Sequence, residues 1–256
     1  MPPGHPPMRR LHPNSPIVAH SSHRALASAT LFALSMLVGP SCGAQRGARA
    51  PSTTRVRIVM ESTTRGNRAT AAILQRAARR LARTAERWSP GLGVVTIRVG
   101  GFSFGEGTFS MYSGDADPLI LMPLSGARRV ERAMLRRRRT RFRAESALVG
   151  IGLHELGHAA AFRYGLEWGD RGEQFADDYL VVLATRTHHP QLIGLVADYL
   201  DEEDAQSPSR PGEGHLANAE RTRRLRCLMR AAAQGKGSCL GMWKDVERDM
   251  RPYLRQ

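Results

Sequence analysis

The chain has 256 residues, enough for one compact domain with a hydrophobic core, and its formal net charge is +15. Such a charge often indicates binding to nucleic acid or to an anionic surface. Here 36 of the 38 basic residues are arginine, a bias that is typical of GC-rich bacterial genomes. The sequence contains no zinc finger, RNA-binding motif or run of interleaved aromatic residues, so we expect no specific nucleic-acid partner.

The N-terminal residues have the order of an export signal. Arginines without any acidic residue precede an apolar run at 25–38, which is shorter than the roughly 20 residues of a membrane-spanning helix. Cys42 is a candidate for lipidation, and cleavage after Ala44 is the alternative. We therefore expect a signal peptide at 1–42 and a linker at 43–53. The mature protein is expected to be exported, either lipid-anchored in the cell envelope or soluble in the periplasm or outside the cell.

Strands come first in the remaining chain, and helices follow. Runs rich in β-branched and apolar residues predict strands at 55–60, 94–99, 108–112 and 119–122. Between the first two of these strands, apolar residues at helical spacing predict a helix over 67–88. This order predicts an α+β fold for a single domain at 54–256, with a small twisted N-terminal sheet and a mostly helical C-terminal half.

The densest group of arginines lies at 136–143, just before the next predicted helix. Such a group could bind an anionic surface such as a membrane. The simpler interpretation is the solvent-exposed surface of a helix.

His154-Glu155-Leu156-Gly157-His158 is the most informative stretch of the chain. Residues four apart lie above one another on a helix, so both histidines can reach one metal ion. Glu155 is then close enough to take a proton from a water molecule at that metal. The motif lies inside an apolar stretch that predicts a buried helix, and buried histidines and glutamate are costly without partners.

Glycines recur along this predicted helix, at positions 150, 152 and 157. Each destabilises a helix by roughly 1 kcal/mol relative to alanine. We therefore expect them to allow close approach of a neighbouring backbone or of substrate.

A catalytic zinc ion needs three protein ligands and an open position for water. A second buried helix, predicted over 173–183, offers Glu173 and Asp177 on one face. We expect Glu173 to be the third ligand and Asp177 to accept a hydrogen bond from the far ring nitrogen of a metal-bound histidine. Asp177 or Asp178 as the third ligand is the competing assignment. The alternative without a metal is that Glu173 and Asp177 are solvent-exposed acids at the start of the helix, where carboxylates are favourable.

The C-terminal part predicts further helices and one disulfide. Helices are expected over 191–199, 216–233 and 242–250, with a polar loop at 205–214. Cys227 and Cys239 remain as an even pair once Cys42 is lipidated or removed. An oxidising compartment permits a disulfide between them, and two free thiols are the alternative.

These motifs resemble those of the zincin metallopeptidases. HExxH followed by ExxxD on a second helix is the pattern of the gluzincins, of which thermolysin is the familiar member. The second helix looks most like bacterial metallopeptidase families of unknown function, in which a string H-x5-R-x5-C-L follows. That string is present here as His215, Arg221, Cys227 and Leu228. The resemblance covers about 145–240 and departs from the family where its usual Glu-Glu pair is Gly172-Glu173.

The resemblance implies a zincin-like fold with one zinc ion held by His154, His158 and Glu173. It implies hydrolysis of a peptide or protein substrate, with Glu155 as general base and acid. His215 and Arg221 become candidates for stabilising the oxyanion. Alternatively, His215 caps a helix and Arg221 pairs with a buried acid such as Asp177.

The resemblance also makes Tyr164 and Tyr179 further oxyanion candidates. It implies that the sheet lies over the HExxH helix and that its edge strand, expected at 119–124, pairs with an extended substrate.

Two other function classes are compatible with the sequence. One is a non-catalytic zinc-bound protein of the cell envelope, acting as a binding or structural module. The other is a basic protein that binds anionic surfaces through the arginines at 136–143. Neither explains why Glu155 lies between the two histidines.

Overall fold

The fold is given by a computed structural model that describes residues 53–61, 67–101, 109–113, 117–138, 140–166, 170–206 and 218–254. All of these belong to one compact unit, Arg49–Gln256. The predicted signal peptide with Cys42, nearly all of the predicted linker, and His215 lie outside the described residues. Among the described helices, none is both long enough and apolar enough to cross a membrane.

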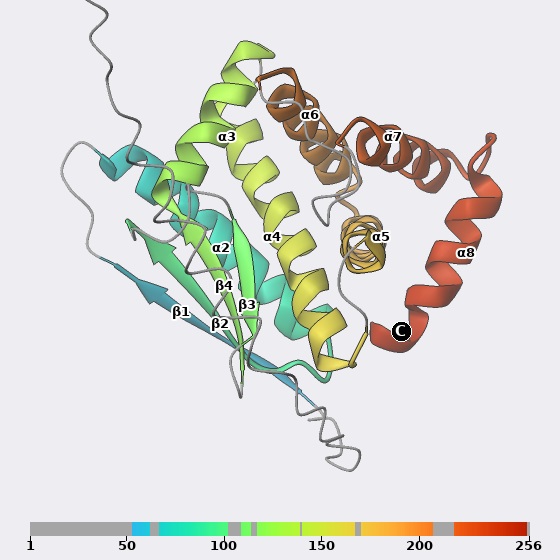
Figure 1. Ribbon diagram of the computed structural model, residues 1–256, viewed down its shortest axis with the longest axis horizontal. Coiled ribbons are helices and arrows are strands. Elements are labelled where there is room, and N and C mark those ends of the chain that lie inside the picture. The colour runs from blue at the N-terminus through green and yellow to red at the C-terminus, as the bar shows by residue number, and fades with distance from the viewer. Residues whose placement is uncertain are drawn as a thin grey trace, which may run out of the picture. The chain divides into compact units, whose positions relative to one another are not determined.

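A four-stranded sheet forms the N-terminal part of this unit, in the order β1-β2-β4-β3 (Figure 1). The strands are β1 (Thr54–Met60), β2 (Gly93–Gly100), β3 (Ser110–Ser113) and β4 (Pro118–Pro123). β1, β2 and β4 are parallel, and β3 is antiparallel to β4. Parallel neighbours need a crossover connection, which α2 (Arg68–Trp88) supplies between β1 and β2. The predicted α+β class, the strand positions and this helix are confirmed.

The prediction that 119–124 is the edge strand is wrong. β4 pairs with β2 along one side and with β3 along the other, so its backbone groups are already used by the sheet. The reason is the short connection between β3 and β4, which makes a hairpin and lays β3 along the outer side of β4. The edge nearest the helical half is therefore β3.

The helical half is built around α4 (Arg141–Arg163), which carries the HExxH motif. α4 packs against α2, β3 and β4 on the sheet side, and against α5 (Asp170–Arg186) and α6 (Gln191–Gln206) on the other (Figure 1). Because it has neighbours on nearly every side, most of its length is buried, as the apolar sequence predicts.

The remaining helices complete this half. They are α3 (Leu124–Arg136), α7 (Asn218–Gln234) and α8 (Leu240–Met250), with a short 3-10 turn at Arg251–Tyr253. The last turn of α6 extends to Gln206 and so includes the start of the predicted loop at 205–214; the rest of that loop is outside the described residues.

Glycines let α4 approach its neighbours closely, as expected. A Cβ atom at Gly157 would lie 2.6 Å from Cα of Ala176 on α5, and one at Gly150 would lie 3.1 Å from the carbonyl oxygen of Leu192 on α6. Real Cβ atoms do not approach backbone atoms to 2.6 Å. The absence of a side chain at Gly157 therefore allows α4 and α5 to pack this closely.

The arginines at 136 and 137 form ion pairs between helices. Arg136 pairs with Glu202 of α6, and Arg137 lies 3.4 Å from Asp201 and 3.5 Å from Glu202. Arg226 of α7 joins the same acidic group, 2.7 Å from Asp201. This part of the arginine-rich segment thus connects α3, α6 and α7.

A disulfide joins α7 to the start of α8. Cys227 is bonded to Cys239, with 5.8 Å between the Cα atoms. The predicted pairing is confirmed. It holds α8 against α7, the helix that carries Arg221.

Candidate metal centre

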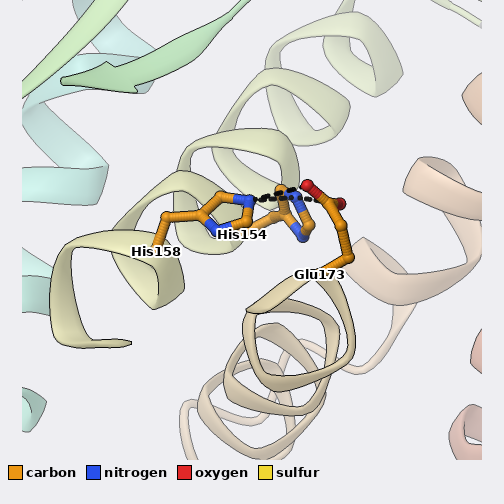
Figure 2. A group of neighbouring side chains, drawn as sticks. All are labelled: His154, His158 and Glu173. Atoms are coloured by element: carbon orange, nitrogen blue, oxygen red, sulfur yellow. Dashed lines mark hydrogen bonds and ion pairs between the residues drawn. The ribbon is translucent and has the colours of Figure 1, made fainter. Parts of the chain in front are cut away.

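Three buried side chains converge between α4 and α5, and Figure 2 shows them pointing toward one another. His154 and His158 come from successive turns of α4, and Glu173 comes from the first turn of α5. Their exposed fractions are 7%, 9% and 6%, and one ligand atom from each lies within 4.8 Å of the others. The close helix approach at Gly157 places the two helices near enough for this meeting.

The distances among these atoms fit a tetrahedral zinc ion. The two Nε2 atoms are 3.1 Å apart. Glu173 Oε1 lies 3.2 Å from His158 Nε2, and Oε2 lies 3.4 Å from His154 Nε2. Tetrahedral ligands at zinc bond lengths of about 2.0–2.1 Å are about 3.3 Å from each other. The donor set of two imidazoles and one carboxylate is also one that zinc favours.

The competing ligands are engaged elsewhere. Asp177 Oδ1 lies 2.9 Å from Nδ1 of His154, on the far side of the ring from the Nε2 atom. Asp178 lies 2.5 Å from Arg224 of α7. Glu173 is therefore the carboxylate that meets both histidines.

Asp177 has the contact expected of a carboxylate behind a metal-binding histidine. A hydrogen bond from His154 Nδ1 leaves Nε2 of that ring to bind a metal, and it fixes the orientation of the ring. Asp177 is held in turn by Arg221, whose Nε and NH2 groups donate to its two oxygens at 3.0 and 2.9 Å. This is a bidentate arginine–carboxylate pair, the most rigid geometry available to such groups.

The charged groups of this cluster strongly shift the pKa values of His154 and Asp177. Burial alone lowers the pKa of His154, but hydrogen bonds to Asp177 and Glu173 outweigh burial and raise the pKa to about 9. Burial raises the pKa of Asp177, but the charges of Arg221 and His154 outweigh it and lower the pKa to about 2. Without a metal, the site therefore holds a proton on His154 at neutral pH.

Glu155 is buried next to this cluster. Burial raises the pKa of Glu155, while the neighbouring His154 and His158 oppose the shift. A raised pKa makes a carboxylate a stronger base, which is the property that a general base requires.

Arg221 lies inside the site, where its guanidinium group pairs mainly with carboxylates and its NH2 also lies 3.4 Å from Nε2 of His154. Besides its bidentate pair with Asp177, its NH1 lies 3.2 Å from Oε2 of Glu173. Of the two roles that the sequence leaves open, the structure shows the pairing with Asp177. Arg221 thereby connects α7 to both carboxylates of α5.

Neither tyrosine candidate for the oxyanion reaches the site. Tyr164 donates its hydroxyl to the carbonyl oxygen of Pro90 at 3.0 Å, and the buried hydroxyl of Tyr179 lies near Ser89. Those two expectations are wrong, because both hydroxyl groups point toward the turn that follows α2. His215 is outside the described residues.

The sequence reasoning missed the second arginine–aspartate pair. Arg224 follows Arg221 by three residues on α7, and Asp178 directly follows Asp177 on α5, so two pairs join the same two helices. The signal was present in the spacing, since residues three apart share a helix face. Burial raises the pKa of Asp178 to about 6 against the opposing charge of Arg224.

Comparison with models of known families, with curated proteins and with solved structures finds no match to this chain. The resemblance to the zincins therefore remains a prediction from the motifs.

Proposed function

We propose that this protein is a zinc-dependent metallopeptidase that hydrolyses peptide bonds. The observation that carries the proposal is the convergence of His154, His158 and Glu173. The two Nε2 atoms are 3.1 Å apart, and each lies 3.2 to 3.4 Å from a different oxygen of Glu173, separations that suit a tetrahedral zinc site. Glu155 lies beside this cluster with a raised pKa, which suits it to act as the base in hydrolysis.

A zinc ion bound there would polarise a carbonyl group and lower the pKa of a coordinated water toward about 7. Glu155 accepts the proton that the attacking water loses, and it then delivers that proton to the leaving amine. Asp177 holds the His154 ring in the tautomer that presents Nε2, and Arg221 holds Asp177.

The substrate strand is proposed to bind along β3. Among the described strands β3 pairs only with β4, and it packs against α4. An extended peptide added to this edge gains backbone hydrogen bonds and passes next to the helix that carries Glu155. The substrate would thus be a peptide or an unfolded segment of a protein.

The protein is further proposed to act outside the cytoplasm, with 1–42 as its signal and Cys42 as a lipid site. The disulfide between Cys227 and Cys239 supports this proposal, because such bonds persist in oxidising compartments. Incorporation of labelled fatty acid into the wild type but not into Cys42→Ser would support the anchor.

The test of catalysis is the variant Glu155→Gln, compared with the wild type on a peptide library read by mass spectrometry. Glutamine has the shape of glutamate but cannot act as the base. We expect turnover to fall by at least 100-fold, in line with the usual contribution of general bases, while zinc content stays the same. Equal cleavage by both proteins would reject the role of Glu155. A zinc-loaded wild type that cleaves nothing would favour the non-catalytic alternative.

A further inference from the structure

We infer that a second site, separate from the metal centre, binds a phosphate-bearing anion. The site is a pocket of about 500 Å³ between α2, α4 and the turn from α5 to α6. Six basic side chains line it, and no lining residue is acidic. They are Arg80, Arg83, Arg87, Arg186, His188 and His189.

One wall of the pocket is a single face of α2. Arg80, Arg83 and Arg87 are spaced three and four residues apart, so they form a row along the helix. Thr84 and Trp88 complete this face. Three guanidinium groups therefore border one concavity from one rigid element.

The opposite wall is the C-terminal end of α5. Arg186 is its last residue, and His188 follows with a φ of 60°, a left-handed conformation that non-glycine residues seldom adopt. The N–H of His189 donates to the carbonyl oxygen of Ala184 at 2.8 Å and closes the helix end. This turn holds two successive histidines at the pocket that the row on α2 also lines.

Among the described residues, the nearby carboxylates leave two of the four arginines without an ion pair. Glu145 is held by Arg76 at 2.7 Å and lies 3.6 Å from Arg80. Glu86 accepts a hydrogen bond from the backbone N–H of Val56 on β1. Within the described part of the chain, Arg83 and Arg87 have no carboxylate within ion-pair distance. The like charges repel one another, and a bound anion would remove that repulsion.

The shape and chemistry of the pocket favour phosphate. Val149, Leu153 and Leu192 provide an apolar floor beneath the basic side chains. The planar guanidinium group matches phosphate oxygens with two parallel hydrogen bonds. A volume of about 500 Å³ holds a group the size of a nucleotide or a phospholipid headgroup. A nucleotide and a phospholipid headgroup both carry phosphate, and the two arms of the experiment distinguish between them.

The pocket shares no residue with the proposed metal centre, although Leu153, which lines the pocket, directly precedes His154 on α4. Arg186 follows Glu173 by 13 positions on α5, which is about 20 Å along a helix. No residue of the metal centre lines the pocket. Binding here can therefore be tested whether or not the protein contains zinc.

The probe is inorganic pyrophosphate, titrated by calorimetry into the purified protein. The pocket variant is Arg83→Gln/Arg87→Gln. Its matched control is Arg68→Gln/Arg79→Gln, which removes the same charge from two exposed positions of the same helix outside the pocket. Circular dichroism verifies that both variants are folded. A second arm measures flotation with phosphatidylcholine vesicles, with and without phosphatidylglycerol.

We expect one pyrophosphate per chain in the wild type and the control, with the dissociation constant raised about tenfold or more in the pocket variant. Flotation that needs phosphatidylglycerol and is lost only in the pocket variant, without pyrophosphate binding, would assign the site to a lipid headgroup. Equal weakening in both variants, or no binding of either probe, would overturn the inference.

Discussion

Replacing Asp177 with asparagine separates its role in the metal centre from its role in stability. The carboxylate accepts from His154 at 2.9 Å and is held by Arg221 at 2.9 and 3.0 Å. Its pKa is lowered from 3.8 to about 2, which corresponds to about 2.5 kcal/mol of folding stability at neutral pH. The contribution is present above pH 3.8 and is lost as the pH falls through about 2.

Asp177→Asn should therefore destabilise the metal-free protein by about 2–3 kcal/mol, or more because Arg221 loses its main partner. The zinc affinity should fall by about 10- to 100-fold, the usual effect of losing the carboxylate behind a histidine ligand. Urea unfolding measures the first effect, and competition with a chromophoric chelator measures the second.

The adjacent Asp178 provides a matched control for this experiment. Asp178→Asn makes the same chemical change at a neighbouring buried aspartate, which pairs with the partly buried Arg224 and, in the described part of the chain, has no hydrogen bond or ion pair with His154. Because the pKa of Asp178 is raised, the charge of Asp178 stabilises the fold less than the charge of Asp177 does. The loss of stability in Asp178→Asn should therefore be smaller than in Asp177→Asn. Zinc affinity should stay within about twofold of the wild type. An equal loss of zinc affinity in both variants would refute the reasoning.

Three further predictions concern pH, packing and the disulfide. Because the pKa of His154 rises from 6.5 to about 9 on folding, the metal-free protein should lose about 3 kcal/mol of stability as the pH rises from 6.5 through 9. For the same reason, zinc binding at neutral pH should release about one proton, which calorimetric titration in buffers of different ionisation enthalpy measures. Gly157→Ala should destabilise the protein by at least about 2 kcal/mol in thermal unfolding, since its Cβ would meet the backbone of α5, whereas Gly241→Ala, with open space around it, should be neutral or stabilising. Removing the disulfide with Cys227→Ser/Cys239→Ser should cost about 2–3 kcal/mol in urea unfolding, and a reductant should then have no further effect.

The local parts of the structure could be predicted from the sequence because they depend on spacing alone. His154 and His158 share a helix face at any position where the helix forms, and the apolar residues around them make that helix buried. Glu173 and Asp177 follow the same rule on the next helix. The glycine at 157 indicated close packing, although its partner, Ala176, could not be named in advance.

The parts that failed depend on which distant elements meet. Strand positions were right, but the prediction of 119–124 as the edge strand was wrong, because the position of β4 inside the sheet depends on the pairing of β3. Arg136 and Arg137 belong to an arginine-rich segment, and only the packing of α3 against α6 reveals their acidic partners. The side of α2 that carries Arg83 and Arg87 likewise becomes a pocket only when the end of α5 lies opposite.

The central claim is that His154, His158 and Glu173 form a zinc site. Elemental analysis of the purified protein, beside the variant His158→Ala, tests it most directly. We predict one zinc ion per chain in the wild type and a loss of zinc in the variant, with circular dichroism showing that both are folded. A folded wild type without zinc after incubation with the metal, or a variant that retains it, would contradict the claim.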